Sequence, residues 1–497
     1  MGVIQRDSFR ITIIAFAGAA IGYLNKVFLF PNFLEPEQVG LANLMITIAL
    51  IYSQVASLGV NNITIRFFPF FKDNPKNHAS FLFAITAFAT AGFVVVSLLV
   101  ALLRQPFNEF YGQSSPLLVE YFWYLVPLAF STLYFNLFDS YLRSLFRNVV
   151  PSLIYEVGLR LFITVSVLLF AFGFLSFPGF VVVYVAANCL PAFILIAYTF
   201  FIGQLSLHPL STPLLKRLRA IMVNYGVYSF LNNLSFLLLA SIDALMIAGM
   251  LNLSAAGIYT TMVFVTSVML IPYRAMLRVS GPVVAGLWKL KDMVKMDELY
   301  KNASSSNLVV GAGLFMLIWV NIDSIFHFMP EEYSLGRYVF LFLGIGRLID
   351  MAAGLNGTIL LTSKRYRIDL LFTIGLVVFT ILSNLALIPR FGINGAAFAS
   401  MASLIIFNIL RIGYLKSRFG IHPFETRQIF VPLILVAIVF ISGLTGRLEN
   451  VFADAVIRSI IAGFAFFIPI YLLRVSASIN NLVNSKLSAL KKMILKT

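Results

Sequence analysis

The chain of 497 residues is 60% hydrophobic and only 11% charged, and its mean hydropathy is +0.93. Because a soluble domain carries about 25% charged residues, these values exclude a soluble globular protein and indicate a protein that faces lipid. The single cysteine, Cys189, excludes an internal disulfide. The sequence contains no nucleotide-binding loop, paired-carboxylate motif or metal-ligand spacing, so we expect no catalytic residues, no bound cofactor and no metal site.

Fourteen apolar segments follow one another along the chain, and each is long enough to be a membrane-spanning helix of about 20 residues. They are residues 11–34, 39–60, 79–103, 117–138, 153–174, 177–202, 221–250, 254–277, 303–329, 335–361, 369–389, 392–415, 428–445 and 452–473. The sequence therefore predicts an all-α polytopic membrane protein with about 14 transmembrane helices.

Lysine and arginine are distributed very unevenly between the predicted loops. If the N-terminus is cytoplasmic, and charges near the ends of spans are counted with the adjoining loop, 28 of the 36 belong to the terminal segments and even-numbered loops, 5 to odd-numbered loops and 3 lie deeper within spans. The positive-inside rule predicts such a bias, and it places both termini in the cytoplasm. Topology and contact with membrane lipid headgroups account for the net charge of +16, so we expect no nucleic-acid partner.

An internal repeat divides most of the chain into two copies. The matching residues are Leu34, Gly40, Leu41 and Met45 with Leu251, Gly257, Ile258 and Met262 (a shift of 217), Leu142 and Arg147 with Leu360 and Arg365 (218), and Gly179 with Gly395 (216). Six crossings return the chain to the same side, so the two copies must be parallel. Parallel repeats are a transporter architecture.

The predicted organisation follows from the repeat and has five parts. They are an N-terminal six-helix lobe (1–203), a cytoplasmic linker (204–220), a C-terminal six-helix lobe (221–416), helices 13 and 14 (417–474) and a basic cytoplasmic tail (475–497).

One motif near the end of the second copy carries a family resemblance. The chain reads Asn384-Leu-Ala-Leu-Ile-Pro389-Arg-Phe-Gly392-Ile-Asn-Gly395-Ala-Ala-Phe-Ala-Ser400. This closely resembles the Asn-Leu-x-Leu-Ile-Pro-x-x-Gly-x-x-Gly-Ala-Ala pattern of polysaccharide and O-antigen flippases, members of the multidrug/oligosaccharidyl-lipid/polysaccharide exporter superfamily. Two further stretches are similar to that family: Ala256-Gly257-Ile-Tyr259 with Pro272, and Leu58-Gly59 followed by Arg66-Phe-Phe-Pro69.

The same motif has a structural interpretation. Pro389 is predicted to end span eleven, because proline cannot continue the helical hydrogen bonds. Gly392 and Gly395 would then permit a tight turn, and the alanines after Gly395 would give span twelve a face for close packing.

The resemblance implies a flippase that moves an undecaprenyl-diphosphate-linked oligosaccharide from the cytoplasmic to the periplasmic leaflet of a bacterial inner membrane. It implies alternating access, driven by an H⁺ or Na⁺ gradient or by consumption of the product, in the biosynthesis of cell-surface polysaccharide such as the O-antigen of lipopolysaccharide. A polysaccharide polymerase and glycosyltransferases would be partners. Two alternatives stay open: a lipid II flippase of peptidoglycan synthesis and a cation-coupled multidrug antiporter.

Lys26 and Asp243 are the most informative charges within the spans, because an ionisable group in hydrocarbon is costly and usually faces a cavity. They are 217 positions apart, so the repeat places them at equivalent positions of spans one and seven. Lys26 is a candidate for binding a diphosphate, and Asp243 for binding a coupling cation or releasing Lys26. The alternative is a salt bridge between them that only closes one side of the transporter.

Five further charges complete the candidate site. Arg347 and Asp350 share one face near the middle of span ten, either as a neutralised pair or with the arginine partly free for substrate. Arg66, Arg274 and Arg278 are predicted at the inner ends of spans two and eight, where they could attract a polyanionic headgroup or serve only as topology charges.

Overall fold

The computed structural model describes residues 2–205, 212–446 and 448–494, and all regular structure in these ranges is helical. Residues 206–211 of the predicted linker and residues 495–497 of the predicted tail lie outside the described residues. The chain separates into two compact units, unit 1 (Met1–Thr261) and unit 2 (Met262–Thr497). The division into lobes at residues 203 and 221 stays a prediction.

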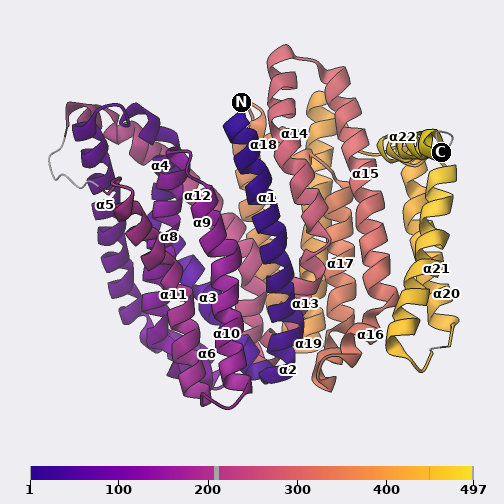
Figure 1. The fold of residues 1–497 in the computed structure, drawn as a ribbon, viewed down its shortest axis with the longest axis horizontal. Helices are drawn as coiled ribbons and strands as arrows, with labels where there is room; N and C mark the ends of the chain where they lie inside the picture. Colours follow the sequence, from indigo (N-terminus) through magenta and orange to yellow (C-terminus); the bar gives the residue numbers. More distant parts are fainter. Residues whose placement is uncertain (1, 206–211, 447, 495–497) are drawn as a thin grey trace. The chain divides into compact units, whose positions relative to one another are not determined.

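Unit 1 contains the first copy of the repeat and the beginning of the second (Figure 1). Its elements are α1 (Gly2–Tyr23), η1 (Leu24–Leu29), α2 (Phe30–Phe33), α3 (Pro36–Ser57), α4 (Val60–Phe67), η2 (Phe68–Phe70), α5 (Pro75–Leu102), α6 (Arg104–Tyr111), α7 (Pro116–Glu120), η3 (Phe122–Tyr124), α8 (Leu125–Ser144), α9 (Val149–Leu153), η4 (Ile154–Gly158), α10 (Leu159–Ala171), α11 (Phe177–Phe201), α12 (Pro213–Met250) and the first part of α13 (Leu253–Ser267). Helix α3 is central, because it packs against α5, α8 and α12.

Unit 2 contains the remaining helices, and α15 lies at its centre. The elements are α14 (Leu270–Leu290), α15 (Met293–Val320), α16 (Ile322–His327), η5 (Glu331–Gly336), α17 (Arg337–Ala352), α18 (Asn356–Thr362), α19 (Tyr366–Phe419), η6 (Thr426–Ile429), α20 (Phe430–Leu444), α21 (Val451–Leu472) and α22 (Ala477–Ile494). Helices α14, α17, α20 and α21 pack on α15. Figure 1 shows α22 lying across the ends of α20 and α21, where the Asn480 side chain donates to the Tyr471 carbonyl (2.8 Å).

The repeat is visible in where the helices begin and end. Helices α5 and α15 each have 28 residues, and their bounds differ by 218 positions at both ends. Both begin with a side-chain cap, in which Asn74 accepts from the backbone N–H groups of residues 76 and 77 and Asp292 from that of Lys295. The backbone bond also holds the pKa of the Asp292 carboxyl below its ordinary value.

The candidate membrane spans bear out the expected class. Among the described residues, ten helices are long and apolar enough to cross a membrane, or twelve if each of two bent helix pairs is one span. The bent pairs are α13 with α14, at 54°, and η5–α17 with α18, at 52°. The chain is therefore an all-α multi-pass membrane protein.

Several predicted boundaries are wrong. Helix α14 continues to Leu290 instead of ending at residue 277, and α12 begins at Pro213 rather than at 221. The chain does not leave the helix at Pro389. The break lies at Gly392, where φ is 59° and ψ is −140°, a conformation that favours glycine because it has no Cβ. Gly395 is required by close packing, since a Cβ there would lie 2.3 Å from the Leu387 carbonyl oxygen.

Candidate functional site

Lys26 lies on η1, a π-helical turn inside the first candidate span. Its Nζ donates to Asn43 Oδ1 of α3 (2.5 Å) and lies 4.1 Å from the centre of the Phe30 ring. Among the residues that the structure describes, no carboxylate is within 4.0 Å of this amino group. Lys26 is therefore a partly buried cation whose charge only a neutral amide and an aromatic ring accommodate.

The neighbouring residue of η1 fixes the turn from the opposite side. The Asn25 side chain is buried, donates to the Arg160 carbonyl of α10 (2.9 Å) and accepts from Thr164 Oγ1 (2.8 Å). A π-helical turn inserts one extra residue into a helix, and such turns are frequent at functional sites. Here two consecutive side chains bond to two different helices, which holds Lys26 against α3.

Asp243 lies in unit 1 with Lys26. The Asp243 carboxylate is buried on α12 and accepts from Tyr259 Oη of α13 (2.7 Å). The salt-bridge alternative and the candidate roles of the two residues in diphosphate and cation binding stay predictions.

Helices α3 and α13 meet through residues that the repeat makes equivalent. Asn43 Nδ2 donates to Thr260 Oγ1 (2.9 Å), and the two residues are 217 positions apart. A Cβ on Gly40 would lie 2.1 Å from the Leu253 carbonyl oxygen, and one on Gly257 would lie 2.0 Å from that of Pro36. The two contacts are equivalent in the repeat, because adding 217 to Gly40 and Pro36 gives Gly257 and Leu253. The two helices therefore cross about a local two-fold axis at backbone contact.

Arg66 lies near the end of α4, as predicted, and is exposed. Its guanidinium stacks over the Tyr225 ring of α12, 4.3 Å from the centre. The stacking orients the arginine and leaves its hydrogen-bond donors to be used by another group.

In unit 2 the structure brings three predicted arginines together. Arg274 is within electrostatic range of both Arg347 and Arg278, and the three lie on α14 and α17. Helix α14 continues for twelve residues beyond Arg278, so the two arginines do not mark the end of the helix, and their place at the inner end of a span stays a prediction. Three arginines at this spacing repel one another and would favour a bound anion.

Arg347 and Asp350 do not neutralise each other in this structure. Among the described residues, neither Arg347 nor Asp350 has an oppositely charged side chain within 4.0 Å. Asp350 Oδ1 instead accepts from Asn408 Nδ2 of α19 (3.2 Å), and the Asn408 side chain also accepts from Asn356 of α18 (2.7 Å). This amide network bridges the 52° bend between α17 and α18.

A buried ion pair near this network was not anticipated. Arg411 and Asp369 both lie on α19, on opposite sides of the break at Gly392, and are joined at 2.5 Å with side chains only 8% and 3% exposed. The sequence did not single out Arg411, because it lies near the predicted end of span twelve, where positive charges are common. Asn43 and Thr260 were missed because they are neutral, although the offset of 217 could have revealed them.

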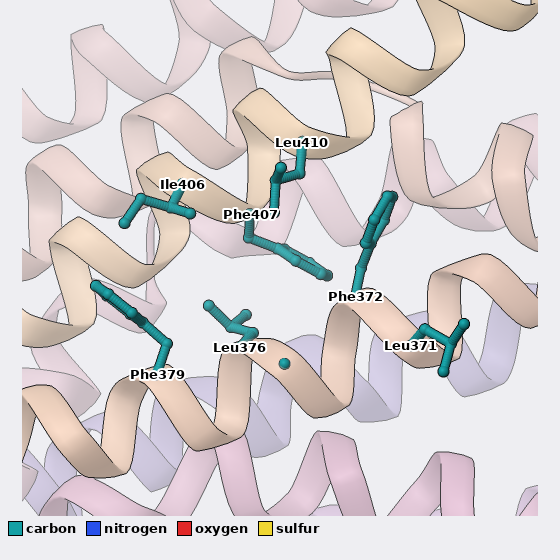
Figure 2. A pocket seen from close by; sticks show the side chains of 8 residues that line it. Leu371, Phe372, Leu376, Phe379, Ile406, Phe407 and Leu410 are labelled. Atoms are coloured by element: carbon teal, nitrogen blue, oxygen red, sulfur yellow. The ribbon is translucent and has the colours of Figure 1, made fainter.

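An apolar pocket of about 280 Å³ lies between the two arms of α19. Figure 2 shows Phe372, Leu376 and Phe379 on one arm facing Ile406 and Phe407 on the other. Leu371, Gly375 and Leu410 complete the lining. Such a lining suits a hydrocarbon chain and provides no polar partner for a headgroup.

The helices and candidate spans define an all-α multi-pass membrane protein. The sequence profile of the family described as "Polysaccharide biosynthesis protein" matches residues 4–288, more than half of the chain. The chain belongs to this family.

One relative is the "Probable low-salt glycan biosynthesis flippase Agl15" of Haloferax volcanii, 24% identical over 221 residues. The aligned region covers 44% of this chain and 46% of that protein, so the match spans less than half of the relative.

Solved structures share the fold at low sequence identity. The lipid II flippase MurJ in an inward closed conformation has a TM-score of 0.70 at 12% identity, over 93% of this chain and 98% of that chain. An inward-facing MATE family multidrug resistance transporter of the MOP superfamily has a TM-score of 0.61 at 15% identity, over 83% and 98%. The family and the fold place the chain among transporters and flippases, not among enzymes.

Proposed function

We propose that this protein is a flippase for a polyprenyl-diphosphate-linked oligosaccharide used in polysaccharide biosynthesis. The observation that carries the proposal is Lys26, a partly buried cation that donates to a neutral amide and that has no carboxylate within 4.0 Å in the part of the chain that the structure describes. A diphosphate supplies the anionic oxygens that such a group favours. The family membership and the glycan flippase relative support the same substrate class.

Arg66 in unit 1 and Arg274, Arg278 and Arg347 in unit 2 are proposed to attract or hold the diphosphate as it moves. Asp243 and Asp350 are proposed to bind an H⁺ or Na⁺ that drives the cycle. Both carboxylates already bond to neutral groups, Asp243 to Tyr259 and Asp350 to Asn408. A cation with oxygen ligands could add to such a carboxylate.

The finer architecture is part of the proposal. Twelve candidate spans become fourteen if α8 is counted and α19 is divided at its break, Gly392. Two parallel six-helix lobes followed by α20 and α21 then result. The positive-inside bias supports a bacterial inner membrane location with both termini cytoplasmic. Undecaprenyl as the polyprenyl, an O-antigen product and coupling to a polymerase and glycosyltransferases are proposed on the same grounds.

The test is reconstitution of the purified protein in liposomes. We would follow the movement of a fluorescent undecaprenyl-diphosphate oligosaccharide between leaflets and, in parallel, the efflux of a cationic dye. Lipid movement well above protein-free liposomes, without dye efflux, is the expected result. Dye efflux without lipid movement would overturn the proposal and identify a drug antiporter. Lipid II in place of the oligosaccharide lipid measures selectivity between the two flippase classes.

A further inference from the structure

A chain of hydrogen bonds joins Lys26 to the crossing of α3 and α13. Lys26 Nζ donates to Asn43 Oδ1 (2.5 Å), and Asn43 Nδ2 donates to Thr260 Oγ1 (2.9 Å). The threonine hydroxyl in turn donates to the Ala256 carbonyl oxygen (2.8 Å). One amide therefore uses its oxygen for the intramembrane cation and its nitrogen for a helix of the other repeat copy.

The position of this amide is special because it lies on the local two-fold axis of the repeat. Asn43 and Thr260 are equivalent residues, and the glycines one turn earlier, Gly40 and Gly257, are equivalent as well. Contacts on a two-fold axis are made by the same patch of both copies, as in a symmetric dimer. Any movement that separates the copies at this end of α3 and α13 must break the bond between Asn43 and Thr260.

Resting on the proposed function, we infer that Asn43 is a positioning residue that couples anion binding at Lys26 to opening of the α3–α13 crossing. A diphosphate oxygen is charged, so it forms a stronger hydrogen bond with the Lys26 ammonium than the neutral Asn43 oxygen does. Once its oxygen is released, the amide is free to rotate and no longer holds its nitrogen toward Thr260. Substrate binding thereby removes one constraint that keeps the crossing closed.

A purely structural role for Asn43 makes a different prediction. If the backbone contact at Gly40 and Gly257 alone held the crossing, replacing Asn43 would alter stability but would not change how the crossing responds to an anion. A measurement of that response separates the two roles.

The reporter is a cysteine at Thr47 in a Cys189→Ser background, so that the chain carries one thiol. Thr47 lies one turn along α3, is partly buried and donates to the Asn43 carbonyl oxygen (2.8 Å). Its rate of labelling by a membrane-impermeant maleimide in proteoliposomes reports opening of the crossing. The rate is measured with and without undecaprenyl diphosphate in the bilayer.

We expect undecaprenyl diphosphate to accelerate labelling several-fold in the Thr47→Cys, Cys189→Ser chain. Adding Thr260→Val should raise the rate without lipid by about fivefold, the effect of one lost hydrogen bond, and should remove most of the response to lipid, because the bond that lipid releases is already absent. Asn43→Leu should label fast whether or not lipid is present. In Asn43→Asp the carboxylate holds Lys26 as an ion pair and can accept a hydrogen bond from the Thr260 hydroxyl, so this variant should label slowly and need more lipid.

Opposite effects of Asn43→Leu and Asn43→Asp would support the coupling, because loss of packing alone would move both in one direction. A normal response to lipid in Asn43→Leu, or equal labelling of both Asn43 variants, would overturn it.

Lipid movement in the same liposomes tests the flippase proposal separately. Movement without a labelling response overturns the coupling alone. A labelling response without movement supports the coupling and rejects the flippase function, and the absence of both overturns both.

Discussion

Lys26 in unit 1 and Arg411 in unit 2 are both cations within helices apolar enough to span a membrane, yet their surroundings are opposite. Arg411 pairs with Asp369 at 2.5 Å and lies over the Phe407 ring, whereas Lys26 donates to the neutral Asn43 amide and lies beside the Phe30 ring. The arginine and its aspartate are neutral as a unit, whereas no carboxylate among the described residues lies within 4.0 Å of the Lys26 amino group. Whether an intramembrane cation is available to bind an anion therefore depends on the carboxylates packed against it as well as on its depth.

The largest effect should come from breaking the neutral pair. Asp369→Asn leaves the Arg411 charge buried without compensation, which is expected to destabilise the protein by about 3–5 kcal/mol. Thermal unfolding of the purified protein in detergent would measure the loss. The double variant Asp369→Leu, Arg411→Met removes both charges and should recover much of the stability. A double variant as unstable as the single one would show that the pair does more than neutralise itself.

Removal of the unneutralised cation should affect transport and not stability. Lys26→Ala removes the charged donor proposed for the diphosphate, so we expect lipid movement to fall on the order of 100-fold, as the loss of one charged hydrogen bond implies. The melting temperature should stay close to that of the unaltered protein, because no ion pair is lost. Lys26→Arg, which keeps the charge, is the matched control and should retain part of the activity. Near-normal lipid movement by Lys26→Ala would remove Lys26 from the site.

Much of the fold could be predicted because a helix that crosses lipid needs about 20 consecutive, mostly apolar residues. Each of the fourteen apolar segments falls on described helix, and the bounds of α11 agree with the predicted span 177–202 to within one residue. Helix ends outside the apolar region were not predictable in the same way. Helix α14 carries Arg278 and Lys289 beyond the predicted end at 277, and a hydropathy pattern cannot distinguish a charged helical extension from a loop.

The residues of the candidate site could be predicted only where they are charged. Lys26 and Asp243 stood out because ionisable groups within spans are rare, but Asn43 and Asn408 are neutral amides and gave no such signal. Partners also depend on three-dimensional packing. Arg347 and Asp350 are three positions apart on one helix, yet the structure gives Asp350 an amide of α19 as its partner. Arg411 and Asp369, 42 positions apart, form the pair that spacing alone did not suggest.

A second ion pair within the spans provides the smallest expected effect and a matched control for the first. Glu156 and Arg160 are joined at 2.8 Å, one turn apart, but their side chains are 31% and 27% exposed, against 3% and 8% for Asp369 and Arg411. Exposed pairs contribute about 0–1 kcal/mol, so Glu156→Gln should lower the free energy of unfolding by no more than that. The same thermal unfolding assay compares it directly with Asp369→Asn, since each change converts one carboxylate to its amide. A loss from Glu156→Gln as large as that from Asp369→Asn would mean that burial does not separate the two pairs. The distinction drawn between neutralised cations and Lys26 would then have no energetic basis.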